Sequence, residues 1–290
     1  MPSPAKIGLA LGSGSARGWA HIGVIRALEE IGVVPQVICG CSIGALVGAA
    51  YAEGELARLE VWVAGLTRRD VVGLLDVGLA GGLLKGDKLM GFLEEHFVDE
   101  DFTALNMPFG CVATELATGR EVWLREGSVA AAVRASIAFP GLFQPVNRDG
   151  RLLVDGALVN PVPVSLCRAL GAEIVIAVDL GSDVVGSSLR RELAAEDKAG
   201  PGWTKRLLAS LGLARNGGGP SMASVLATSL HIMQTRIARS RLAGEPADVL
   251  IAPRLAHLAL MDYHRGQEAM TEGHAAVKRM VPVIEHALAQ

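Results

Sequence analysis

Aromatic side chains are scarce in this chain, at 4% of its residues, whereas glycine occurs 35 times among 290. Such a composition suits a fold with many tight strand–helix turns and closely packed helices. The hydrophobic share of 50% is enough for the core of one α/β domain of this length.

The chain also lacks an excess of either charge. Its net charge is −3, and no acidic or basic run marks a tail. Composition therefore gives no case for nucleic-acid binding, which normally needs a basic face. The four cysteines, which form no CxxC pair, are Cys39, Cys41, Cys111 and Cys167. We interpret them as buried thiols in a reducing compartment, and we expect neither a metal site nor a cofactor.

Long hydrophobic runs of the kind that cross membranes are missing as well. The apolar run at 7–12 is shorter than the hydrophobic part of a signal peptide. The stretch 31–52 carries no charge and is long enough to span a bilayer, but Pro35, Gly40 and Ser42 interrupt it. A strand, a turn and a helix explain it better. We predict a soluble, cytoplasmic protein that could associate peripherally with membranes.

What the chain does contain is an alternation of strands and helices. Residues 6–11 predict a buried strand, 18–31 a helix, 37–41 a second strand and 43–53 a helix of small residues. Such an alternation is typical of a parallel sheet with right-handed crossovers. Further predicted elements are helices at 55–66, 86–97, 129–137 and 163–170, and strands at 109–114, 121–124, 151–154 and 173–179.

The C-terminal part combines a polar segment with long helices. Residues 181–220 are rich in glycine, serine and charge, and a loop of that length is usually functional or poorly ordered. We weigh a lid or membrane-contact segment, with Trp203 and Leu207 at the interface, against a disordered surface loop. The remaining predicted elements are C-terminal helices within 221–288, at 221–242 and 263–288, around a strand at 249–252. We predict a single domain over residues 1–290.

The strongest chemical motif lies between the second strand and the helix that follows it. Gly40-Cys41-Ser42-Ile43-Gly44 fits G-x-S-x-G, in which the serine sits on a strained turn with no room for bulk two residues before and after it. The N-terminus of the next helix favours a developing negative charge. We therefore predict that Ser42 is a nucleophile, with Gly40 and Gly44 shaping its elbow. The alternative is a merely structural turn.

A second loop of small residues joins the first strand to the first helix. Successive backbone N–H groups in such a loop can converge on one oxygen, as in an oxyanion hole. A dinucleotide-binding turn is the rival interpretation, but Arg17 stands where its third glycine would be, and no acid follows about 20 residues on. Arg17 either orients the loop or meets a substrate phosphate. The candidate oxyanion-hole residues are Gly12, Ser13, Gly14, Ser15, Ala16 and Arg17.

A serine nucleophile needs a base, which is usually histidine. None of the seven histidines follows a predicted strand end, and each is typical of a surface or core residue. Asp155 has a better setting, because it closes a predicted strand before Gly156 and would lie with Ser42 at the carboxyl edge of the sheet. The same position suits a structural turn acid, so the residues alone leave both roles open.

Three of these segments together resemble the patatin-like phospholipase family, and within it bacterial proteins similar to the neuropathy-target-esterase group. They are the loop at 12–18, the elbow at 40–44 and the D-G-A turn at 155–157, with R-A-S-I-A-F-P at 134–140 similar to a further family block. The resemblance implies a three-layer α/β/α fold with a mainly parallel central sheet. It also implies a Ser42–Asp155 dyad without a catalytic histidine, and an oxyanion hole in the first loop. The family's triple glycine appears here as Ser13-Gly14-Ser15, so a positive φ at 13 or 15 would carry a cost.

The activity that the resemblance implies is hydrolysis of acyl esters of phospholipids or lysophospholipids through an acyl-enzyme intermediate. The same dyad would serve an acyltransferase, a thioesterase or a small-ester hydrolase, and a catalytically silent regulatory scaffold is the alternative of another class. Expected partners are the lipid acyl-ester substrate and, transiently, a membrane surface. The apolar C-terminal helices would allow a homodimer. We assign five methionines to the helix core rather than to an acyl-chain tunnel, namely Met222, Met233, Met261, Met270 and Met280.

Overall fold

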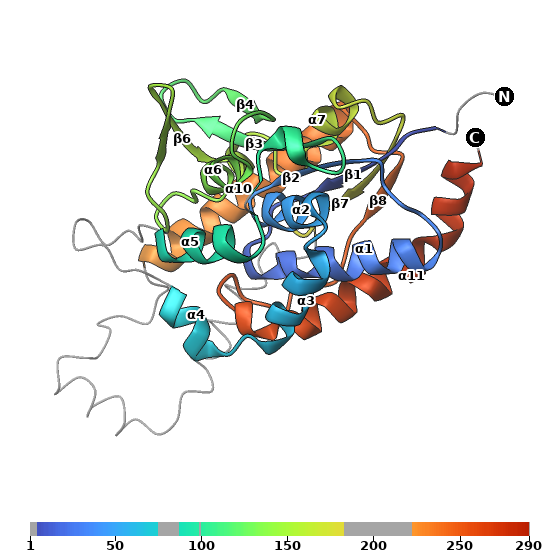
Figure 1. Cartoon of the computed structure of the whole chain (residues 1–290), viewed down its shortest axis with the longest axis horizontal. Helices are drawn as coiled ribbons and strands as arrows, with labels where there is room; N and C mark the ends of the chain where they lie inside the picture. The colour runs from blue at the N-terminus through green and yellow to red at the C-terminus, as the bar shows by residue number, and fades with distance from the viewer. Residues whose placement is uncertain (1–4, 75–86, 99, 183–221, 290) are drawn as a thin grey trace.

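One central sheet organises the molecule, shown as a computed structural model in Figure 1. The structure describes residues 5–74, 87–98, 100–182 and 222–289. Within them, the strand order is β5-β6-β3-β2-β1-β7-β8, with β4 also paired with β3. The strands are β1 (Ile7–Leu11), β2 (Val37–Cys41), β3 (Phe109–Glu115), β4 (Glu121–Leu124), β5 (Val146–Arg148), β6 (Arg151–Asp155), β7 (Ile174–Val178) and β8 (Val249–Ile251). The pairs β3–β2, β2–β1, β1–β7 and β7–β8 are parallel, whereas the β3–β4, β3–β6 and β5–β6 pairs are antiparallel.

Both faces of the sheet carry a buried core. In β1, Leu9 and Leu11 belong to one cluster of buried side chains and Ala10 to another. In β7, Ile176 and Ala177 divide between the same two clusters. Since successive side chains of a strand point to opposite faces, the two clusters are the cores on the two faces of the sheet. Helices contribute to each cluster, which confirms the predicted α/β/α layers.

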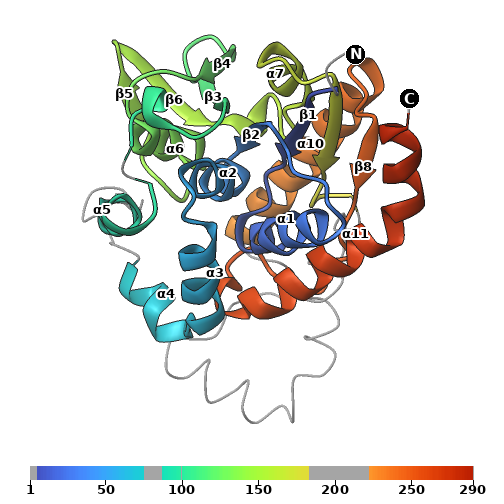
Figure 2. The same cartoon turned by 45° about the vertical axis from the view of Figure 1, so that its right-hand side comes forward.

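The larger core lies under α1 (Ala20–Glu30), α2 (Ile43–Glu53), α3 (Leu56–Gly65) and α11 (Gly266–Leu288). Helices α1 and α11 run side by side on this face (Figures 1 and 2). Two glycines allow their backbones to touch. A Cβ added at Gly23 would lie 1.9 Å from Met270 O, and one at Gly273 would lie 2.0 Å from Ala20 O. Any side chain there would force the helices apart.

The smaller core lies under α7 (Val164–Ala169) and α10 (Met222–Gly244), through residues such as Leu166 and Ala238. Around the antiparallel edge, α5 (Asp87–His96) and α6 (Val129–Ser136) add to the larger core. The other described helices are α4 (Arg68–Leu74) and the 3-10 helices η1 (Ser15–Trp19), η2 (Phe102–Ala104), η3 (Gly156–Leu158) and η4 (Tyr263–Arg265).

The predicted mainly parallel α/β fold is confirmed, with differences at its edge. Strand β5 and helix α4 were not expected, because each is short and lacks a clear apolar period. Of the polar segment at 181–220, only the first two residues are described, so Trp203 and Leu207 lie outside the described residues. No helix in the described ranges combines the length and the apolar character needed to cross a membrane.

Candidate active site

Ser42 occupies the strained turn that its motif predicts. It lies between β2 and α2 with φ 56° and ψ −124°, a positive φ that a non-glycine residue rarely adopts. A Cβ at Gly40 would lie 2.3 Å from Gly44 O, and one at Gly44 would lie 2.3 Å from Leu11 O. Both glycines are therefore required for strand β2, the elbow and α2 to pass this close to one another and to β1.

A fully buried serine supports the backbone of this elbow. Ser42 N donates to Ser136 Oγ at 2.9 Å, and Ser136 Oγ donates in turn to Val112 O at 2.7 Å. The hydroxyl thus ties the strained residue to β3. Ser136 was not among the predicted site residues; its place in the block at 134–140, which is similar to a family block, is the only sequence feature that points to it.

Asp155 faces the nucleophile directly. Ser42 Oγ donates to Asp155 Oδ2 at 2.6 Å, and Asp155 Oδ1 accepts from Ala157 N at 2.9 Å. The carboxyl group is fully buried, and burial raises the pKa of Asp155 to about 6, against the two hydrogen bonds, which lower it. At neutral pH Asp155 is therefore an anion, and a stronger base than an ordinary aspartate.

Asp155 reaches Ser42 by a route that the sequence interpretation did not foresee. Strand β6 is antiparallel to β3, so its carboxyl end does not point to the edge where β2 ends. The register resolves this, because Asp155 pairs with Ala113 while Cys41 pairs with Val112. Strand β6 overlaps only the last part of β3, and so both Ser42 and Asp155 lie level with Ala113, on either side of it.

Four amides of the loop at 12–17 are already used. Gly12 N donates to Val178 O at 3.0 Å and Ser13 N to Pro161 O at 2.9 Å. Ala16 N donates to Leu260 O at 3.2 Å, and Arg17 N to Gly14 O at 3.3 Å. The expectation that all six residues form an oxyanion hole is thus too broad, because a backbone N–H bound to a carbonyl has no proton left for a substrate oxygen.

The amides of Gly14 and Ser15 differ from their neighbours. No group in the described part of the chain accepts a hydrogen bond from either N–H, and both residues line the cavity that contains Ser42 and Asp155. Ser15 has a positive φ of 52°. This conformation costs free energy for serine, whereas the glycine that the family has in this run would adopt it freely. A Cβ at Gly14 would lie 2.7 Å from Leu180 Cδ1, so this glycine is needed for close packing.

Two buried side chains, those of Arg17 and His21, donate hydrogen bonds to carbonyl groups of the same loop. His21 Nε2 donates to Gly12 O at 2.7 Å, and burial lowers the pKa of His21 to about 4, so it is neutral. Arg17, which is 1% exposed, donates through Nε to Gly14 O at 3.2 Å. Two roles were considered for Arg17, and this hydrogen bond supports the first, which is to orient the loop.

A cavity of about 820 Å³ opens beside Ser42 and Asp155. This is the size of a pocket for a small ligand, typically about 300–1,000 Å³. Apolar side chains form most of its wall, namely Trp62 and Leu66 near α3, Val71 and Leu74 of α4, Leu89 and Leu93 of α5, and Leu226, Leu230 and Met233 of α10. Met233 and Met261 both line the cavity and are partly exposed, so their assignment to the helix core was wrong, whereas Met270 is buried in the larger core as predicted.

The polar part of the wall includes Asp179 and His231. Burial, and then the positive charge of Arg17, lowers the pKa of His231 to about 4, so its imidazole is neutral. None of the seven histidines, all of which are described, hydrogen bonds to Ser42. Among the described residues, no group of three or more histidine, cysteine, aspartate or glutamate side chains is arranged to hold a metal ion.

Fold and geometry define an α/β protein with a serine on a strained strand–turn–helix elbow, hydrogen-bonded to a buried aspartate. Residues 9–168 match the family model described as patatin-like phospholipase. The chain belongs to the patatin-like phospholipase family, whose class is that of lipid ester hydrolases.

Individual relatives agree with this membership. A protein of Mycobacterium tuberculosis named an uncharacterized NTE family protein is 32% identical, over 98% of this chain and 96% of the relative. Patatin-like phospholipase domain-containing protein 6 of Homo sapiens is 35% identical over 61% of this chain and 13% of that longer protein. VipD from Legionella pneumophila shares the fold, with a TM-score of 0.59 and 16% identity over 97% of this chain and 67% of that chain.

Proposed function

We propose that this protein hydrolyses acyl esters of phospholipids or lysophospholipids, with Ser42 as nucleophile and Asp155 as base. One observation carries the proposal. Ser42 Oγ, on a strained elbow in the wall of a largely apolar cavity, donates a 2.6 Å hydrogen bond to a fully buried carboxylate. Burial makes that carboxylate basic enough to take the hydroxyl proton as the nucleophile attacks.

The reaction would run through an acyl-enzyme. Ser42 Oγ bonds to the ester carbonyl carbon as its proton passes to Asp155 Oδ2, which already accepts that proton in a hydrogen bond. The tetrahedral intermediate collapses when the C–O bond to the alcohol breaks, and the alcohol leaves with the proton held by Asp155. Water then attacks the acyl-enzyme with Asp155 as base, which releases the carboxylic acid and restores the Ser42 hydroxyl.

The negative charge on the carbonyl oxygen needs donors. The N–H groups of Gly14 and Ser15 are the candidates, since they line the cavity and the other amides of the loop at 12–17 are bound to carbonyls. Each donor of this kind contributes about 10²–10³ to the rate. The N-terminus of α2, which begins immediately after Ser42, adds a favourable dipole.

The shape of the cavity supports a substrate with a long apolar part. Side chains of α3, α4, α5 and α10 line it together with Ser42, so an acyl chain bound there would place its ester at the nucleophile. Leu226 and Met233 of α10 line this cavity and are also more than half exposed to solvent. This supports transient contact of the cavity mouth with a lipid surface.

A direct test combines labelling with substrate profiling. A fluorophosphonate probe should label Ser42, as mapped by mass spectrometry, and Ser42→Ala should lose at least about 10³-fold in hydrolysis of phospholipids, lysophospholipids and a p-nitrophenyl ester. Ser240→Ala, an exposed serine of α10 outside the cavity, is the matched control and should keep full activity.

The outcome also separates the alternatives. Turnover of acyl thioesters without turnover of any phospholipid or lysophospholipid would contradict the proposed substrate class. Absence of labelling and of hydrolysis across the whole panel would contradict the enzymatic proposal itself and favour a silent scaffold.

A further inference from the structure

The segment between β8 and α11 contacts the loop at 12–17 through Leu260 and Tyr263. Ser15 Oγ donates to Leu260 O at 2.7 Å, and it lies 2.8 Å from Tyr263 Oη. Because the carbonyl can only accept, it takes the one hydroxyl proton of Ser15, and the Tyr263 hydroxyl is therefore the donor in the second hydrogen bond. Ala16 N also donates to Leu260 O, at 3.2 Å.

These bonds hold Ser15 in a conformation that serine does not favour. Its φ of 52° lies in the left-handed region, which costs free energy for a residue with a Cβ. A glycine would adopt the same φ freely but would have no hydroxyl to anchor. In this chain, two hydrogen bonds through the side chain fix the residue, and they thereby fix the direction of its backbone N–H.

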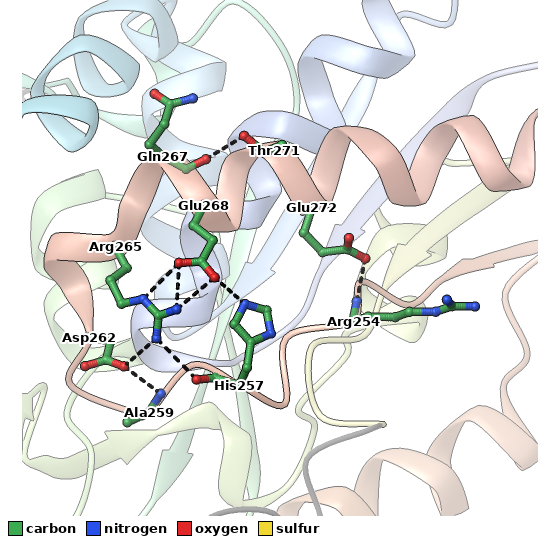
Figure 3. A network of polar contacts seen from close by, with 9 residues as sticks. All are labelled: Arg254, His257, Ala259, Asp262, Arg265, Gln267, Glu268, Thr271 and Glu272. Carbon is green, nitrogen blue, oxygen red and sulfur yellow. Dashed lines mark hydrogen bonds and ion pairs between the residues drawn. The ribbon is translucent and has the colours of Figure 1, made fainter.

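The segment that provides these partners is itself tightly held (Figure 3). The Arg265 guanidinium binds Glu268 on the first turn of α11 at 2.8 Å, and it also contacts the Asp262 carboxylate at 3.4 Å and His257 O at 3.3 Å. Asp262 Oδ2 accepts from Ala259 N at 3.0 Å. The turn that carries Leu260 is thus tied to the start of α11.

Tyr263 is also held at its backbone and its ring by Trp19, the last residue of η1. Trp19 Nε1 donates to Tyr263 O at 3.2 Å, and the two rings pack edge to face with their centroids 6.0 Å apart. The hydroxyl of Tyr263 therefore has little freedom to follow Ser15 if Ser15 moves. This makes it a fixed reference point for the loop at 12–17.

We propose that Leu260 and Tyr263 are positioning residues, which hold Ser15 so that its backbone N–H points at the oxyanion of the reaction. This inference rests on the proposed function. Both residues lie beyond residue 168, where the match to the family model ends. The C-terminal segment therefore completes a donor site whose other parts lie within the first 20 residues of the chain.

The experiment compares kcat and KM for a p-nitrophenyl ester in Tyr263→Phe, Ser15→Ala and Ser15→Gly. Tyr263→Phe keeps the ring and loses one hydrogen bond, so kcat should fall about 10-fold, with KM within twofold. Ser15→Ala loses both hydrogen bonds but keeps the Cβ, so kcat should fall about 10²-fold. Ser15→Gly should lie between them, because glycine tolerates the positive φ.

Three further measurements separate positioning from general damage. The end point of fluorophosphonate labelling counts intact sites, so that kcat refers to folded enzyme. The affinity for a trifluoromethyl ketone, which forms an oxyanion on Ser42, should fall in parallel with kcat. The double variant Ser15→Ala/Tyr263→Phe should be no worse than Ser15→Ala, because the two changes break one shared contact.

Tyr51→Phe is the matched control, since Tyr51 lies in the last turn of α2 and does not line the cavity. It should keep wild-type kcat. If kcat of Tyr263→Phe and Ser15→Ala stays within twofold of wild type while Ser42→Ala is inactive, the positioning role is wrong and the proposed function stands. If Ser42→Ala remains active, the proposed function fails, and this inference fails with it.

Discussion

Replacement of Asp155 by asparagine would separate two effects of the buried carboxylate, namely its contribution to catalysis as a base and the loss of stability that its burial causes. The two side chains have nearly the same shape. Asparagine would still accept from Ala157 N through Oδ1, and its Nδ2 would donate to Ser42 Oγ in place of the present hydrogen bond. The carboxamide keeps one hydrogen bond to each of the two present partners, so the main change is the loss of a negative charge from a fully buried position.

The magnitude follows from the pKa of Asp155. Burial raises this pKa from 3.8 to about 6, which corresponds to about 3 kcal/mol at 1.36 kcal/mol per pKa unit. The folded carboxyl binds its proton more tightly than the unfolded one. Its contribution to stability is therefore fully present below pH 3.8 and is lost as the pH rises through about 6. The free energy of unfolding of Asp155→Asn should equal that of wild type at pH 3.5 and exceed it by about 3 kcal/mol at pH 8.

Urea unfolding at pH 3.5, 6 and 8, together with ester hydrolysis at pH 8, measures both effects. We expect Asp155→Asn to gain stability as calculated and to lose about 10²–10⁴ in kcat, the usual contribution of a general base. Ser42→Ala is the matched control. It is also inactive, but it keeps the carboxylate and removes a hydrogen bond that lowers the pKa of Asp155, so its stability should fall with pH at least as steeply as that of wild type.

Two results would refute this reasoning. An Asp155→Asn variant with near-normal hydrolysis would show that Asp155 is not the base. An unfolding free energy equal to that of wild type at both pH 3.5 and pH 8 would show that the carboxylate carries no burial cost, and its basicity would then lack the cause assigned to it.

Three further predictions concern the same site and the packing behind it. The kcat/KM of wild type should rise with pH with an apparent pKa near 6, because the base is the ionised Asp155; a rate independent of pH between 5 and 8 would contradict this. Ser136→Ala should lower kcat about 10-fold with KM unchanged, since the Ser42 amide loses its partner, and steady-state kinetics on a short ester would measure the effect. Gly273→Ala should lower the free energy of unfolding by about 1–3 kcal/mol, because a Cβ would lie 2.0 Å from a carbonyl oxygen of α1. Gly91→Ala in α5, where a Cβ meets nothing within 4 Å, is its control and should be neutral or stabilising.

Local features of this molecule could be predicted from its sequence. Strand β2 and helix α2 have the predicted bounds, because the motif between them constrains the backbone over a few residues. Ser42 has a positive φ for the same reason, since only glycines two positions away leave room for the turn. The small-residue loop at 12–17 was likewise recognisable, because residues without bulk are needed wherever a backbone must approach another closely.

The functional details of that loop were not predictable, because they depend on partners far away in the chain. Which amides are free is decided by Val178, Pro161 and Leu260, whose carbonyls take three of them. The conformation of Ser15 depends on Tyr263, which is 248 residues away. No local pattern encodes a hydrogen bond between segments at such a separation.

Asp155 shows the same division most clearly. The sequence by itself determined that an aspartate closes a strand before a glycine turn, and that no histidine follows a strand in the same way. Only the tertiary structure decided that this strand runs antiparallel to β3 and overlaps just its last residues, which brings Asp155 level with Ser42. Strand direction and register result from packing between distant segments, whereas the strained elbow and the glycine turn result from sterics within a few neighbouring residues.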